Sequence, residues 1–304
     1  MIWFVVASTI WKRRSPFVES SKIRRYLTGD VLGTLETLLA RADATPGATV
    51  DLALYELGDR ELIDALTTRA GRIRVILSNS SKPRDGTNWD DGNAVPRQTL
   101  HDTAGLEVHD RMFNNRHIGH NKFAVYRDAA GHPKAVMTGS TNWTSTGLCG
   151  QSNNAILIED DAVAGDYLAY WDRLLADAFP APDPLSLGTS NKQGQPLRTA
   201  NMATPSERTL SDGTRVGIWC APNTKATTKG KSIPPDLSAV YSLMRKASHA
   251  ILFAVFLPSR SGKTSIVEEA IADRHERPDR PGVGRDQRRH RHAELRRARP
   301  RRRG

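Results

Sequence analysis

A strand–helix–strand unit near the start of the chain constrains the fold most strongly. The runs VDLALYEL (50–57) and RIRVILSN (72–79) are rich in β-branched and large apolar residues, as strands are. Between them, DRELIDALTTRAG (59–71) has helical spacing, with Asp59 as N-cap and Gly71 as the stop. Strands that alternate with helices in this way predict an α/β fold with a parallel sheet.

Further elements follow the same logic of apolar spacing and turn residues. Apolar residues recur at helical intervals over 31–42, and a polar loop is expected from Ser80 to about Arg97. Up to the second copy of the repeat, the remaining expected elements are a helix at 98–104, strands at 106–109, 122–128, 134–140, 154–160 and 215–222, and a helix at 166–179.

The order helix, strand, short helix occurs at 31–71 and again at 238–272, which predicts a two-fold internal repeat. His120 follows Leu52 by 68 residues, so its counterpart in the second copy falls near position 320, after the last residue of this 304-residue chain. The first half is therefore expected to be complete and the second half partial.

The basic charge is concentrated at the C-terminal end. The chain carries a net charge of +11, but residues 273–304 hold 13 Arg, no Lys and 5 acidic residues, which leaves residues 1–272 at only +3. With four aliphatic residues in 32, this tail is expected to be disordered. It could be a basic arm for nucleic acid or anionic lipid, or an inert end. We favour out-of-frame translation, because the change in composition falls inside a repeat unit.

Two further features carry little functional information. Cys149 and Cys220 are too few for a disulfide framework and form no CxxC pair. The N-terminal apolar run is about ten residues long, which is too short to span a bilayer. Its basic residues follow the run instead of preceding it, as they would in a secretory signal, so a cytoplasmic location is the default expectation.

Residues 119–161 hold the densest group of chemically active side chains. His120 and Lys122 alternate at the start of a predicted strand, so the strand period of two places both side chains on one face. Gly139, Ser140 and Asn142 follow at the end of the next strand, where a hydroxyl and an amide can stabilise an oxyanion. Ser140 and Asn142 could instead only cap a turn. His117 and His120 lack the further ligands that a metal pair needs.

This segment resembles the phospholipase D superfamily, whose motif is H-x-K-x4-D followed by G-S-x-N. His120, Lys122, Gly139, Ser140 and Asn142 match, and QSNNAILI is similar to the stretch that follows G-S-x-N in the family. The resemblance covers residues 31–180 and, weakly, 215–272. It implies an α-β-α sandwich with a mixed, largely parallel sheet.

One position departs from the family pattern. Strict spacing puts the acid at Arg127, and the nearest acid is Asp128, one residue later. A shift of one residue moves a side chain to the other face of a strand. Either a bulge restores Asp128 to the site or the acid is not needed here.

The resemblance also implies a mechanism and a set of roles. His120 would attack phosphorus to form a phosphohistidine, with Asp128 as the third motif residue. Lys122, Ser140 and Asn142, beside Gly139, would hold the non-bridging oxygens. Asn153 would orient the nucleophilic histidine. A second histidine would protonate the leaving alcohol, and no metal or cofactor is required in the family.

The sequence leaves three functions open: a phospholipase D-like hydrolase acting on phospholipid, a nuclease on the same scaffold, or a phosphate-binding remnant without activity. A nearly neutral body disfavours the nuclease. The missing histidine could come from a homodimer, so a monomer is expected to be weak or inactive.

The expected regions are an uncertain segment at 1–30, the catalytic half at 31–180, a linker at 181–213, a partial second half at 214–272 and the tail at 273–304, which could bind polyanions non-specifically.

Overall fold

The structure is a computed structural model. It describes residues 5–7, 22–79, 90–112, 119–178, 195–223, 233–248, 251–253, 266–276 and 282–284. The interpretation of His117 lies outside these residues, as does most of the predicted polar loop. The chain divides into two compact units, Met1–Cys220 and Ala221–Gly304, which are described separately.

The first unit is built on a seven-stranded sheet with the order β1-β7-β6-β5-β2-β3-β4. Among the described strands, β2 with β3 and β3 with β4 are parallel, and the other neighbouring pairs are antiparallel. The mixed α/β sheet is confirmed, but antiparallel pairs outnumber parallel ones, because β5 returns into β6 through a tight turn instead of a crossover helix. The strands are β1 (Val5–Ala7), β2 (Thr49–Leu54), β3 (Ile73–Ser78), β4 (Glu107–Arg111), β5 (Lys122–Arg127), β6 (Pro133–Gly139) and β7 (Asn153–Ile158).

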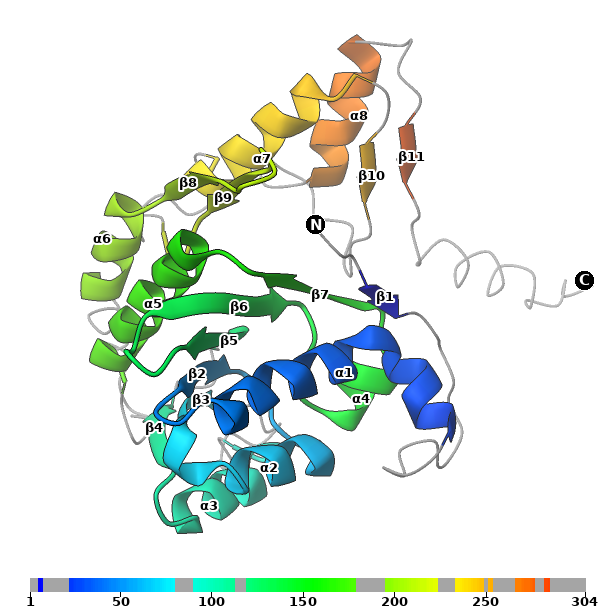
Figure 1. The fold of residues 1–304 in the computed structure, drawn as a ribbon. Helices are drawn as coiled ribbons and strands as arrows, with labels where there is room; N and C mark the ends of the chain where they lie inside the picture. The colour runs from blue at the N-terminus through cyan, green and yellow to red at the C-terminus, as the bar shows by residue number, and fades with distance from the viewer. Residues whose placement is uncertain are drawn as a thin grey trace, which may run out of the picture. The chain divides into compact units, whose positions relative to one another are not determined.

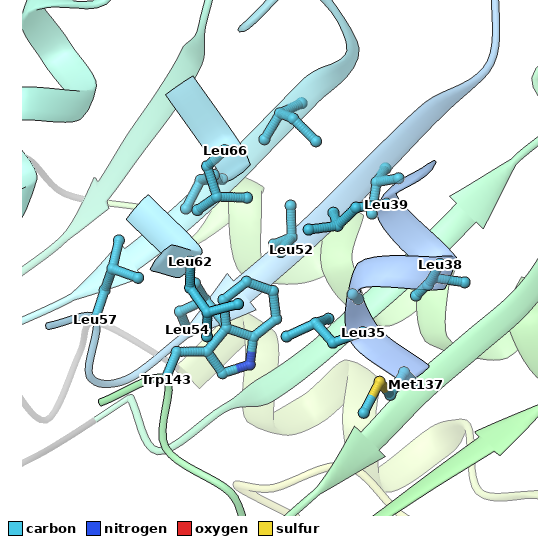
Figure 2. Close-up of a cluster of buried hydrophobic side chains, with 14 of the residues drawn as sticks. Leu35, Leu38, Leu39, Leu52, Leu54, Leu57, Leu62, Leu66, Met137 and Trp143 are labelled. Carbon is cyan, nitrogen blue, oxygen red and sulfur yellow. The ribbon is translucent and has the colours of Figure 1, made fainter. Parts of the chain in front are cut away.

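Helices cover both faces of this sheet, with α1 and α4 on one side and α5 and α6 on the other (Figure 1). On the first side, Leu35 and Leu38 of α1 pack with Leu52 of β2 and Trp143 in a large buried cluster (Figure 2). On the second side, the fully buried Trp171 of α5 donates from Nε1 to the carbonyl oxygen of Leu52 at 2.8 Å. The helices are α1 (Lys22–Ala44), α2 (Arg60–Thr67), α3 (Ala94–Asp102), α4 (Ser145–Cys149), α5 (Asp161–Ala176) and α6 (Gln195–Ala203).

Local side-chain chemistry explains where several elements begin. Asp59 caps α2 as predicted, since its carboxylate accepts from the amide of Leu62 at 3.3 Å. Asp160 caps α5 in the same way by accepting from Val163 at 2.9 Å, so this helix begins five residues before the predicted start. Gly71 does not end α2 directly but lies in a short 3-10 turn after it.

Part of the predicted linker is ordered. Residues 195–203 form α6, and β8 (Ser206–Thr209) pairs with β9 (Arg215–Ile218) in an antiparallel hairpin. Leu197 and Ile218 are buried in the cluster around α5. The apolar residues of 195–213 show no regular spacing, which is why the sequence pattern indicated a linker there, whereas Ile218 lies in the strand expected at 215–222.

The second unit contains α7 (Pro235–Lys246), β10 (Ile251–Phe253), α8 (Ile266–Glu276) and β11 (Gly282–Gly284), and its two strands are parallel. The same order of elements, with parallel strands, occurs in α1-β2-α2-β3 of the first unit. The short β11 lies inside the segment expected to be disordered, whose remaining residues are largely outside the described ones. No described helix combines the length and apolarity needed to cross a bilayer.

Candidate active site

The two half-motifs meet at one edge of the sheet. β5 runs antiparallel to both β2 and β6, so the start of β5 lies beside the end of each of them. The register pairs Lys122 with Leu54 and Phe123 with Thr138. His120 and Lys122 therefore share this edge with the residues that follow β6 and with Tyr55 and Glu56, which follow β2.

His120 and Lys122 both lie against the ring of Tyr55. The exposed imidazole of His120 meets this ring edge-on, with the centroids 4.6 Å apart. The Lys122 side chain is buried, its Nζ lies 5.1 Å from the centre of the same ring, and it donates to the carbonyl oxygen of His120 at 3.3 Å. The Tyr55 ring thus contacts both the exposed imidazole of His120 and the buried ammonium group of Lys122.

Desolvation, partial at His120 and strong at the buried Lys122, sets the protonation of this pair. Desolvation lowers the pKa of His120 below its ordinary value, and the charge of Lys122 lowers it further. Desolvation lowers the pKa of Lys122 to about 8, partly opposed by the carboxylate of Glu56. Near neutral pH the imidazole is therefore a free base that can act as a nucleophile, while the lysine remains largely charged.

Asn142 is held by a residue that the motif comparison missed. Its Nδ2 donates to Oε2 of Glu56 at 2.6 Å. Desolvation raises the pKa of Glu56, and Lys122 opposes that rise. The backbone holds the two segments together, because the amide of Trp143 donates to the carbonyl oxygen of Glu56 at 3.1 Å. The available sequence signal was a carboxylate near the end of the predicted apolar strand 50–57.

Ser140 is positioned by β7. Its hydroxyl donates to Oδ1 of Asn153 at 3.1 Å and accepts from the amide of Asn154 at 2.9 Å. Asn153 also donates to the carbonyl oxygen of Gly147 at 2.8 Å. Within the described residues it makes no hydrogen bond to His120, so the structure places Asn153 behind Ser140 and not behind the histidine that it was expected to orient.

Gly139 lies where β6 approaches β7 closely. A Cβ at this position would lie 2.8 Å from Cα of Ala155 and closer still to the carbonyl oxygen of Asn154. No side chain fits there without moving a strand, so glycine is required to bring Ser140 to its place.

Asp128 is not brought together with these residues. It follows the far end of β5, about 20 Å from Lys122 at the usual rise of a strand. Its carboxylate accepts from the amides of Ala130 at 3.0 Å and His132 at 2.9 Å, which closes the turn to β6. The register does shift between Tyr126 and Arg127, but this irregularity does not return Asp128 to the site.

The position of the motif acid holds the opposite charge. Nε of Arg127 lies 2.8 Å from Oδ2 of Asp51, a fully buried carboxylate on β2. Nε of Arg74 on β3 lies 2.5 Å from the other oxygen of Asp51. The carboxylate that pairs with Arg127 of β5 therefore belongs to Asp51 on the neighbouring strand β2. Among the described residues, no group of three or more His, Cys, Asp or Glu side chains could hold a metal ion.

Comparison with known protein families gives a match over part of the chain. Residues 37–175 match the family model described as cardiolipin synthase, PLD-like domain. No curated protein sequence matches the chain.

Solved structures extend the comparison to the fold. The chain is similar to phosphatidylserine synthase from Haemophilus influenzae, with 13% identity, a TM-score of 0.52, and coverage of 84% of this chain and 59% of that one. It is similar to NucT from Helicobacter pylori, with 16% identity, a TM-score of 0.42, and coverage of 60% and 99%. It is also similar to the phospholipase D family member Nuc from Salmonella typhimurium, with 18% identity, a TM-score of 0.35, and coverage of 48% and 90%. Residues 37–175 of this chain are therefore a phospholipase D-like domain.

Proposed function

We propose that this chain cleaves phosphodiester bonds, with His120 as the nucleophile. The observation that carries the proposal is the convergence at one sheet edge of an exposed imidazole, the buried ammonium group of Lys122 and the amide of Asn142. A lowered pKa keeps His120 unprotonated near neutral pH, as a nucleophile requires. The lysine and the amide supply the charge and the hydrogen bond that a phosphoryl group needs.

The reaction follows from these roles. An imidazole nitrogen of His120 attacks phosphorus, a nitrogen–phosphorus bond forms, and the bond to the leaving alcohol breaks. Water then attacks phosphorus and gives its proton to the group that protonated the leaving alcohol, and the nitrogen–phosphorus bond breaks. Lys122 and Asn142 stabilise the oxygen charge in both steps, and Ser140 joins them when its hydroxyl turns from Asn153 to the substrate.

The leaving alcohol needs a proton donor, which we assign to His120 of a second copy of the chain. A two-fold dimer would bring two equivalent edges together, and each copy would then supply the acid for the other. Activity should therefore rise with the fraction of dimer. A strictly monomeric sample, verified by light scattering, is expected to be weak or inactive, and full turnover by such a sample would contradict this assignment.

We favour a phospholipid as the substrate. The matched family model carries the description cardiolipin synthase, PLD-like domain. Residues 1–272 carry a net charge of only +3, which is small for a protein that binds nucleic acid. A charged polymer backbone is usually bound through several basic side chains. The near-neutral body therefore supports a lipid better than a nucleic acid.

The test compares three substrates: bis(p-nitrophenyl) phosphate, phosphatidylcholine vesicles and a single-stranded oligonucleotide. We expect release of nitrophenol and of choline, both lost in His120→Ala. The matched control is His132→Ala, because His132 lies exposed in the turn after β5. Cleavage of the oligonucleotide alone would favour the nuclease, and equal turnover by His120→Ala would overturn the proposal.

A further inference from the structure

The carboxylate of Glu56 is unexpected in a site proposed to bind phosphate. It accepts from Asn142 at 2.6 Å and interacts electrostatically with Lys122, so it is next to two of the three groups assigned to hold the substrate oxygens. A carboxylate near a bound anion repels it. The strength of this repulsion depends on the charge of the ligand, so Glu56 affects ligands of different charge to different degrees.

Glu56 also fixes the orientation of the Asn142 amide. A carboxylate only accepts hydrogen bonds, so the amide must present Nδ2 to it. Oδ1 of Asn142 is then buried without a hydrogen-bond partner among the described residues. Glu56 thus holds the amide in one orientation against the cost of an unpaired acceptor, as expected for a positioning residue.

The balance of charge completes the argument. Among the described residues, Tyr55, Glu56 and His120 are the titratable groups next to the Lys122 ammonium. His120 is neutral near pH 7, so the charges of Glu56 and Lys122 cancel. Counting only the residues that the structure describes, the site therefore has almost no net charge before a ligand enters. A phosphodiester brings one negative charge and a phosphomonoester brings close to two.

We propose that Glu56 is a specificity-determining residue, which admits the singly charged phosphodiester and disfavours the doubly charged phosphomonoester. The proposal rests on the proposed function, because it assigns the substrate class of the same site. Repulsion from Glu56 grows with ligand charge, so it acts about twice as strongly on the monoester. Such discrimination would also keep a phosphomonoester product from occupying the site.

The test uses Glu56→Gln, which removes the charge and keeps a side chain able to hydrogen-bond to Asn142. The probes are diphenyl phosphate and phenyl phosphate, measured by calorimetry at about pH 7, where the monoester is mostly doubly charged. Both are measured in the full chain carrying His120→Ala, so that the diester is not consumed. Glu36→Gln is the matched control, because it removes the same charge from an exposed position on α1.

We expect Glu56→Gln to raise the affinity for phenyl phosphate relative to diphenyl phosphate by roughly tenfold, as expected for one close charge in a partly buried site. The control should leave this ratio within about twofold, as for an exposed charge screened by salt. Equal ratios in the two variants would overturn the inference while leaving the proposed function intact. Failure of the parent protein to bind either probe would overturn the proposed function, and the inference with it.

A second readout needs no ligand. Lysine labelled with ¹³C at Cε reports the titration of Lys122 by NMR. Removing the Glu56 charge should move the Lys122 midpoint below its value of about 8, since the carboxylate stabilises the ammonium form. Glu36→Gln should leave it in place. An unchanged midpoint in Glu56→Gln would show that the two charges are not paired, and would overturn the inference.

Discussion

Arg127 and Asp51 form an ion pair across β5 and β2, with Nε of Arg127 2.8 Å from Oδ2 of Asp51. The Asp51 side chain is fully buried and also contacts Arg74 at 2.5 Å. In the motif that the chain otherwise follows, position 127 would hold an acid. Here the acid comes from β2 and the base from β5, and their ion pair joins these two neighbouring strands.

This pairing predicts unequal costs for its members. Asp51→Ala leaves two arginines without their buried partner and is expected to lower the free energy of unfolding by about 3 kcal/mol. Arg127→Ala should cost about 1 kcal/mol, because Arg74 still neutralises Asp51. Urea denaturation measures both, with Asp64→Ala on the exposed face of α2 as the control. Equal costs for Asp51→Ala and Arg127→Ala would contradict the shared pairing.

The pH dependence of turnover should have two limbs. Activity rises as His120 loses its proton, with a midpoint below the ordinary histidine value of about 6.5. It falls as Lys122 loses its charge, near its pKa of about 8. The measurement is kcat/KM on the nitrophenyl diester across pH, because nitrophenolate leaves without a proton and the acid histidine then adds no limb of its own. Lys122→Arg, whose guanidinium stays charged, should move the alkaline limb upward in whatever activity remains. An alkaline limb that stays at the same pH in that variant would assign it to another group.

Asp128 provides a test of the motif itself. Its two backbone hydrogen bonds close the turn between β5 and β6, far from the sheet edge where the site lies. Asp128→Ala should therefore lower the melting temperature by a few degrees, as loss of about 1 kcal/mol does, and leave kcat/KM within about twofold. A loss of activity as large as that of Lys122→Ala, at unchanged melting temperature, would return Asp128 to the catalytic group.

Gly139→Ala should damage the site through the backbone. The added Cβ meets Asn154 and Ala155, the residues whose strand holds the Ser140 hydroxyl. We expect at least a tenfold loss in kcat/KM with the fold retained, because a misplacement of the order of 1 Å is costly in an active site. Gly131→Ala in the β5–β6 turn controls for glycine replacement away from the site. Unimpaired turnover by Gly139→Ala would show that this close approach is not needed.

The sequence predicted the parts of the structure that follow from local pattern. Buried strands and their connecting helices give strong periodic signals, so β2, α2 and β3 appear close to their predicted places. His120 and Lys122 were found because their spacing matches a motif. Glu56 and Asp51 were not found, because their contacts come from residues distant in the chain. Glu56 contacts Asn142, and Asp51 contacts Arg127. The contact of Asn153 with Ser140 was not predicted for the same reason, since it depends on how β6 and β7 pair.

The central claim is that His120 carries the phosphoryl group between the two steps. The most direct measurement is to mix the protein with bis(p-nitrophenyl) phosphate, quench in base, digest, and analyse the peptides by mass spectrometry. We predict a nitrophenyl phosphoryl group on the peptide that contains His120, lost on exposure to acid and absent in His120→Ala. Turnover of the diester with no modified histidine at any time point, or with the group on another residue, would contradict the account.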